Sequence, residues 1–145
     1  MTQPPYPPPS GSPEPPYRAE PPTGALPWGL GLFVFFPIPF VGSVIAGIAM
    51  VISSTSQIKY GGLARENANR AANWGLTYLL ATFVLVGAHF GILFVQREIE
   101  GFFPFGLIIL TWLAVTVLHI VFTIIGLVRA SRRQPVRING IPFFR

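Results

Sequence analysis

The chain contains no cysteine and no aspartate, and it has few charges of either sign. Five glutamates are its only carboxylate side chains, and charged residues make up 10% of the 145 positions. Without thiols, disulfides and Cys-based metal sites are excluded. No Gly-rich phosphate loop, nucleophile elbow or HExxH motif is present. We therefore expect a protein that is not an enzyme, with no catalytic residues, no metal site and no cofactor.

What the chain has in abundance is apolar residues. They make up 51% of the sequence, and the mean hydropathy is +0.56. Soluble domains carry about 25% charged residues. Three long apolar runs predict spans at about residues 28–53, 74–95 and 103–128. The second gives about 33 Å of helix, enough for a hydrocarbon core of roughly 30 Å. The expected fold is an all-α integral membrane protein with three transmembrane helices.

Two polar tails flank the expected transmembrane domain at residues 28–128. Residues 1–27 hold eleven of the sixteen prolines, which predicts a disordered tail with polyproline II character. Pro5 and Pro8 satisfy a PxxP pattern, so a ligand for a proline-reading domain is an alternative to a plain solvated tail. Residues 129–145 form a basic C-terminal tail with five of the ten Lys and Arg residues.

The first apolar run contains two prolines, Pro37 and Pro39, near its middle. Each removes a backbone donor and disfavours helix at the preceding residue. We favour one Pro-kinked span over residues 28–53. In the alternative, Trp28 to Phe36 forms a short re-entrant or interfacial piece, and the true span starts near Pro39.

A polar connection at residues 54–73 leads into the second span. After Gly61-Gly62, alanines recur at helical spacing. We therefore predict one continuous helix from about Leu63 into the second span. Glu66 and Arg70 form an i,i+4 pair. Three asparagines of this stretch are expected to be solvated at the level of the lipid headgroups: Asn67, Asn69 and Asn73.

The basic residues predict the orientation. With three spans, eight of the ten Lys and Arg lie on the side of the 54–73 connection and the C-terminal tail. The positive-inside rule then puts the C-terminus in the cytoplasm of a plasma-membrane protein and the QREIEG turn at residues 96–101 outside. The N-terminal tail is outside for three spans and cytoplasmic if the first run is re-entrant. The expected partners are the bilayer and anionic lipid headgroups rather than nucleic acid.

Small and polar residues inside the spans are the candidate contact sites. The candidates for close helix packing are Gly42, Gly47, Gly87 and Gly91. The candidates for polar contacts between helices are His89, Thr116, His119 and Thr123. The two histidines are expected about 12 Å apart along the membrane normal, too far to share a metal. We expect each to be a neutral imidazole bonded to a Thr or a backbone carbonyl, with proton relay or haem ligation as the alternative.

Several short motifs occur in the order found in a known group of proteins. They are Ala72-Asn73-Trp74 with Thr77 one turn later, Gly126 and Ala130 at the end of the third span, and the closing Pro142-Phe143-Phe144-Arg145. Over Pro27 to Arg145 the chain resembles small bacterial membrane proteins related to the chloroplast inner-envelope import component of the Tic translocon. This resemblance implies a compact helical membrane domain, and protein translocation in the plastid branch.

Two functions remain open from the sequence. The first is a non-enzymatic helical module that assembles with other membrane proteins or with copies of itself. The second is a channel or protein-translocation subunit that acts as an oligomer. Three helices in one chain cannot enclose a pore, so the second function requires a polar lumen between chains, lined by Thr116, His119 and Thr123.

Overall fold

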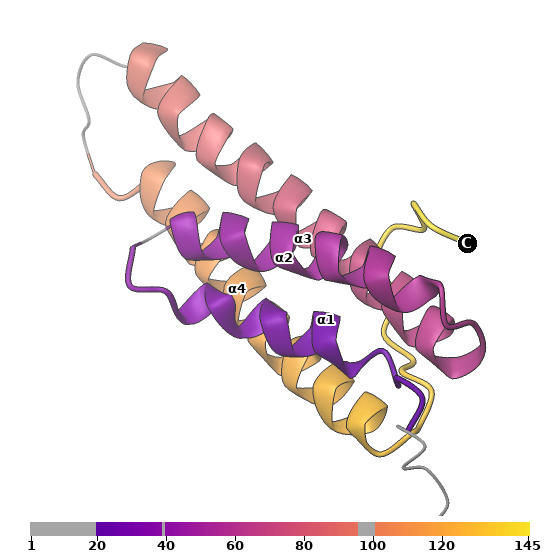
Figure 1. The fold of residues 1–145 in the computed structure, drawn as a ribbon. Helices are drawn as coiled ribbons and strands as arrows, with labels where there is room; N and C mark the ends of the chain where they lie inside the picture. The colour runs from indigo at the N-terminus through magenta and orange to yellow at the C-terminus, as the bar shows by residue number, and fades with distance from the viewer. Residues whose placement is uncertain (1–19, 39, 96–100) are drawn as a thin grey trace, which may run out of the picture.

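The computed structural model describes residues 20–38, 40–95 and 101–145, and all regular structure in these ranges is helical. The elements in order are α1 (Ala25–Leu30), the 3₁₀ helix η1 (Gly31–Phe35), α2 (Val41–Ile58), α3 (Gly62–Val95) and α4 (Phe105–Ser131), shown in Figure 1. By length and composition, α2, α3 and α4 can each cross a membrane. The expected all-α membrane fold with three long helices is confirmed.

The first apolar run folds back on itself. Phe36, which precedes Pro37, has an extended ψ of 130° and ends the helical path of α1 and η1. A Cβ on Gly31 would meet the Met50 sulfur, and one on Gly42 would meet the Val34 carbonyl, so α1–η1 runs antiparallel to α2. Residues 28–53 are therefore not one kinked span. The structure matches the re-entrant alternative, because the short piece is followed by a long helix from Val41.

The turn between α2 and α3 contains two glycines with positive φ, Gly61 at 70° and Gly62 at 48°. L-residues rarely adopt this backbone, so the Gly-Gly pair makes the reversal easy. From there α3 continues without a break to Val95, as predicted from the alanine spacing. The apolar windows of α3 and α4 are each 11% buried within the chain, against 39% for that of α2. The long helices α3 and α4 therefore present most of their apolar surface outward.

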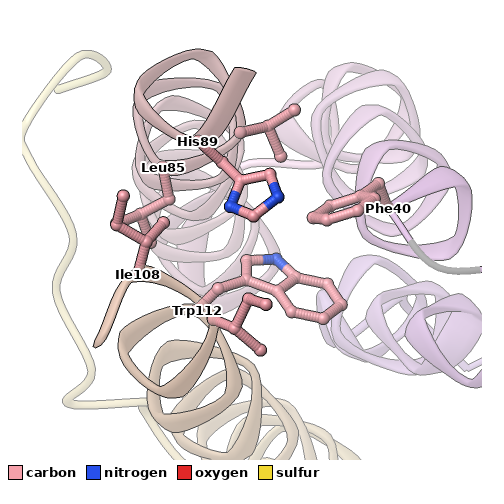
Figure 2. Close-up of a pocket in the computed structure, with 7 residues that line it drawn as sticks. Phe40, Leu85, His89, Ile108 and Trp112 are labelled. Carbon is pink, nitrogen blue, oxygen red and sulfur yellow. The ribbon is translucent and has the colours of Figure 1, made fainter. Parts of the chain in front are cut away.

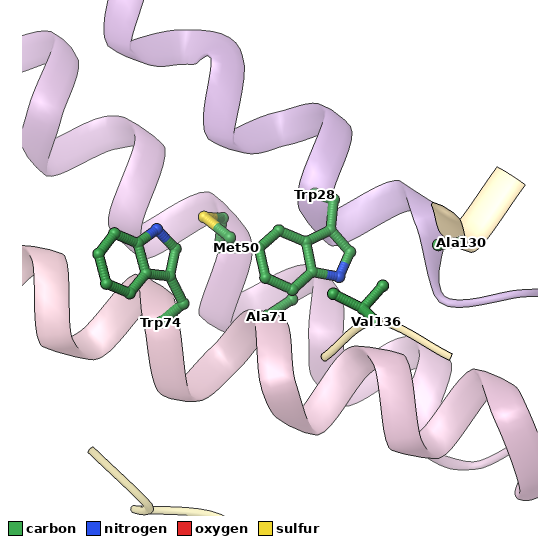
Figure 3. Packing of buried hydrophobic residues seen from close by; sticks show 6 residues of the cluster. All are labelled: Trp28, Met50, Ala71, Trp74, Ala130 and Val136. Atoms are coloured by element: carbon green, nitrogen blue, oxygen red, sulfur yellow. The ribbon is translucent and has the colours of Figure 1, made fainter. Parts of the chain in front are cut away.

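A small core joins the short first helix to the long ones (Figure 3). Its buried members are Trp28, Met50, Ala71, Trp74, Ala130 and Val136. The Trp28 side chain is 0% exposed, and a Cβ on Gly126 would overlap its indole ring. Only glycine at 126 lets α4 approach the tryptophan this closely. The core therefore depends on one large ring from α1 and small residues on its neighbours.

Both ends of the described chain meet at one end of the bundle. Arg133 forms an ion pair with Glu20. Gly24 has φ 76° and sits against α3, where a Cβ would meet the Ala64 carbonyl at 2.7 Å. Residues 20–24 therefore lie beside the C-terminal segment, residues 132–145, as the re-entrant alternative requires (Figure 1). The predictions for the tail at residues 1–19 and for most of the QREIEG turn lie outside the described residues.

Candidate functional site

His119 of α4 is the centre of a buried polar cluster. Its side chain is 0% exposed. Nδ1 accepts a hydrogen bond from Trp74 Nε1 at 3.2 Å, and Nε2 lies 3.0 Å from the carbonyl oxygen of Gly31. The indole N–H can only donate and the carbonyl can only accept, so these bonds define a neutral ring with its proton on Nε2. His119 thus ties α3 and η1 to α4.

Tyr78 of α3 extends this cluster to α2. Its ring stacks on the His119 ring with centroids 3.8 Å apart and planes at 19°. The phenol donates to Ser43 Oγ at 2.7 Å and lies 3.2 Å from Thr116 Oγ1. Thr123 Oγ1 lies 3.4 Å from His119 Nε2. The cluster therefore brings together three of the four candidate polar residues, namely Thr116, His119 and Thr123, within one chain.

The chemistry open to this cluster is limited by its own bonding. Both ring nitrogens of His119 and the Tyr78 hydroxyl already have partners inside the chain. Across residues 20–38, 40–95 and 101–145, no three His, Cys, Asp or Glu side chains gather as a metal site would require. The cluster therefore works as a polar connection between helices, where satisfied hydrogen bonds fix one arrangement of the core.

Asn67, at the start of α3, holds both chain ends. Its side chain is 0% exposed, whereas the sequence analysis expected it to be solvated. Nδ2 donates to the carbonyl of Thr23 at 2.9 Å and to that of Gln134 at 3.2 Å, and Oδ1 accepts from Val136 N at 2.8 Å. The solvated assignment is wrong for Asn67 and also for Asn73, which is 9% exposed, because the C-terminal segment covers both side chains and supplies their partners.

Asn73 and Thr77 bind the C-terminal segment further along α3. Asn73 Oδ1 accepts from Phe144 N at 2.7 Å, and its Nδ2 donates to the Phe144 carbonyl at 2.9 Å. Thr77 Oγ1 accepts from Ile141 N at 2.8 Å. We call Asn67, Asn73 and Thr77 the tail clamp. No local sequence signal marked it, because its partners in the C-terminal segment are 64 to 71 residues away in sequence, and Asn73 borders the same surface as Glu66 and Arg70.

His89 lies elsewhere, toward the opposite end of α3. Tyr78 precedes it by about three turns, roughly 16 Å of helix rise, so the two histidines do not meet. The His89 ring packs edge-on against Phe105, with centroids 5.4 Å apart. Together with Phe40 and Trp112 it lines a pocket of about 190 Å³ between α3, α4 and the start of α2 (Figure 2).

The four candidate glycines divide into two pairs. A Cβ on Gly47 would overlap Leu79, and one on Gly42 would press on the backbone before α2, so both sit in close contacts. Gly87 and Gly91 face open space, because a Cβ on either would meet nothing within 4 Å among the atoms of the described chain. The α2 glycines, Gly42 and Gly47, therefore allow close packing within the chain, whereas the α3 glycines, Gly87 and Gly91, lie on its surface.

These features define the class of the protein. It is a small helical membrane protein with a buried polar cluster that is hydrogen-bonded within the chain, and its C-terminal segment is bound to α3. A family model matches residues 23–144, which include every described helix. The chain belongs to this family, MamF/MmsF, the magnetosome magnetite crystal formation protein family. Neither a curated protein nor a solved structure matches the chain.

The family match corrects the resemblance to the Tic component, which is wrong. The short motifs behind that resemblance have local packing roles in this structure. Gly126 makes room for Trp28, Ala130 is buried, and Asn73 and Trp74 make the hydrogen bonds described above. Small residues and bonded polar residues at such positions serve any compact helical membrane domain, so they do not identify one family.

Proposed function

We propose that this chain is a non-enzymatic membrane module that contributes to magnetite crystal formation by assembling with other membrane proteins or with further copies of itself. The observation that carries the proposal is the family match over residues 23–144, the whole described helical domain. The bonded interior supports a structural role, because the buried cluster of His119 and Tyr78 leaves no reactive group open to a substrate.

We further propose that the end bearing the C-terminal segment faces the cytoplasm and contacts anionic lipid headgroups. Eight Lys and Arg residues support this orientation, all near this end of the bundle: Lys59, Arg65, Arg70, Arg129, Arg132, Arg133, Arg137 and Arg145. Basic residues are retained on the cytoplasmic side during insertion, and each contributes about 1 kcal/mol near an anionic surface. A reporter fused after Arg145 that proves to be outside the cytoplasm contradicts this orientation.

The surface proposed for assembly is the outward apolar side of α3 and α4. Most of the side chains in their apolar windows are not buried within the chain. The channel alternative has less support, since His119 and Thr123 are 0% exposed and bonded inside one chain. Because the polar groups of His119 and Thr123 already have partners within one chain, they are not available to line a polar lumen between chains.

A complementation experiment tests the crystal-forming role. The chain is expressed in a magnetite-forming bacterium that lacks its own member of this family, and crystal size is measured by electron microscopy. We expect the wild type to restore crystal size, and the Asn67→Leu variant to fail because its clamp is broken. Crystals that stay unchanged with a well-expressed, membrane-inserted wild-type chain contradict the proposal.

A separate measurement tests assembly. The purified full chain is placed in nanodiscs or mild detergent, and the mass of the complex is determined. We expect a defined oligomer, or a stoichiometric complex with one membrane protein added in purified form. A chain that stays monomeric, and for which no added partner co-purifies, rules out the assembly mechanism even where complementation succeeds.

A further inference from the structure

The pocket beside His89 combines an apolar lining with polar atoms that have no partner. Phe40, at the start of α2, places its ring 4.6 Å from the Trp112 ring of α4. The His89 ring comes from α3, and aliphatic side chains such as Leu85 and Ile108 complete the lining. Figure 2 shows the three aromatic side chains converging on one space. Flat rings on several sides of one space suit a flat ligand.

Two nitrogens at this pocket are buried without a hydrogen bond. Neither His89 Nδ1 nor Trp112 Nε1 has a partner in the part of the chain that the structure describes. The indole N–H can only donate, so it requires an acceptor, whereas an imidazole nitrogen can accept or donate. A carbonyl oxygen between them accepts from Trp112 and, when Nδ1 carries the proton, from His89 as well.

The pocket lies between two helices that are long and apolar enough to cross a membrane, and their length places it at the depth of the lipid chains. His89 precedes the end of α3 at Val95 by about 9 Å of helix rise, and Trp112 follows the start of α4 at Phe105 by about 10 Å. Water is scarce at this depth, so a polar group there must find its partner in protein or in a membrane-dissolved molecule. Buried unpaired donors are rare in proteins and call for such a partner.

We propose that this pocket binds the carbonyl-bearing head of a membrane-dissolved molecule, with the chemistry of a quinone ring. A cavity of about 150 Å³ accommodates benzene, so one of about 190 Å³ accommodates a substituted six-membered ring. Trp112 and His89 supply the hydrogen bonds, and Phe40 supplies an aromatic wall. The same carbonyl chemistry is available from the acyl ester of a phospholipid, which is the second source that an experiment must separate.

The test uses the full chain in nanodiscs of ester-linked phosphatidylcholine. Decylubiquinone is titrated in and binding is measured by calorimetry, with decylbenzene as a ligand that has the same tail and no carbonyl. We expect saturable binding of decylubiquinone, one per chain, at least about tenfold tighter than that of decylbenzene. Trp112→Phe and His89→Phe, which each keep an aromatic ring, should each weaken decylubiquinone binding about tenfold.

A matched control is Thr82→Val on α3. Thr82 Oγ1 is also buried without a partner among the described residues, but Thr82 does not line the pocket. Thr82→Val should bind decylubiquinone like the wild type. The proposal is overturned if decylbenzene binds as tightly as decylubiquinone in the wild-type chain, a comparison that needs no variant. It is also overturned if folded Trp112→Phe and His89→Phe chains bind as the wild type does.

Ether-linked phosphatidylcholine separates the two sources of the carbonyl. These lipids lack the acyl ester, so decylubiquinone should bind more tightly in them if lipid esters normally fill the pocket. Unchanged affinity points to a quinone-like molecule as the ligand. Both results support recognition of a carbonyl at His89 and Trp112.

Discussion

The two ends of this molecule treat polar groups in opposite ways. At the end that holds the C-terminal segment, the side chains of the tail clamp (Asn67, Asn73 and Thr77) form hydrogen bonds with backbone groups. Toward the other end, His89 and Trp112 bury nitrogens without a partner among the described residues. We call the first end the closed end, because the chain's own C-terminal segment satisfies its polar groups. We call the second the open end, because its two buried nitrogens can still bond a partner.

The glycines repeat this contrast. Gly126, near the closed end, makes room for the Trp28 ring, and a Cβ on Gly140 would meet the carbonyl oxygen of Asn73 at 2.5 Å. Gly87 and Gly91, toward the other end, meet nothing within 4 Å in the described chain. Close packing and satisfied hydrogen bonds therefore coincide at the closed end. Substitutions there should be costly, and matched substitutions at the open end should cost little.

The largest effect is expected for Asn67→Leu. This change removes the partners of three backbone groups, at Thr23, Gln134 and Val136, of which the Val136 bond is buried and the other two are partly buried. Stranding the buried Val136 N–H costs about 1–3 kcal/mol, and the two partly buried carbonyls add less than this each, so we expect a loss of about 3 kcal/mol. SDS-driven unfolding in mixed micelles, followed by circular dichroism, measures the change.

The control for Asn67→Leu is Asn69→Leu, at a partly exposed position of the same helix. It should change the unfolding free energy by less than about 0.5 kcal/mol. Equal losses at the two positions would show that the C-terminal segment is not held by the clamp.

Gly126→Ala should follow, with a loss of about 1–3 kcal/mol. The added Cβ would overlap the fully buried Trp28 indole, a rigid neighbour, so α4 or the ring must move. Gly29→Ala is the matched control, because its Cβ would make an ordinary contact with Leu127 at 3.6 Å. Thermal unfolding of both variants in detergent compares them, and a Gly126→Ala chain as stable as Gly29→Ala would refute the tight packing of Trp28.

A smaller loss, about 1 kcal/mol, is expected for Tyr78→Phe. The change removes the hydroxyl that bonds Ser43 and Thr116, and it keeps the ring that stacks on His119. Tyr60→Phe, at a tyrosine that is 54% exposed, should have no measurable effect. The difference between the two unfolding midpoints is the test, and no difference would mean that the hydroxyl adds nothing to the α2–α3–α4 contact.

The sequence predicted the helical class and the long third helix because both depend on local patterns. Apolar length predicts spans, and the alanine spacing after Gly61-Gly62 predicts that α3 starts near residue 63. The path of the first run could not be predicted in this way. A kinked span and a re-entrant piece have the same hydropathy, and only contacts such as Gly31 with Met50 distinguish them.

The polar residues show the same limit. The sequence analysis named Thr116, His119 and Thr123 as candidate polar contacts, and the structure joins them in one cluster with Tyr78. The partners of Asn67 come from segments 44 and 67 residues away in sequence. No local pattern tells a solvated asparagine from one that a distant segment covers, so the tail clamp emerged only from the structure.

The smallest effect is expected at the open end, for Gly87→Ala and Gly91→Ala. A methyl group at either position meets no atom within 4 Å in the described chain, and alanine favours helix over glycine by about 1 kcal/mol in water. Each variant should therefore unfold at the same SDS concentration as the wild type or at a slightly higher one. A clear loss of stability that appears only at high protein concentration would instead place another chain against this face of α3. The open end would then be closed by assembly, as the tail clamp closes the other end within one chain.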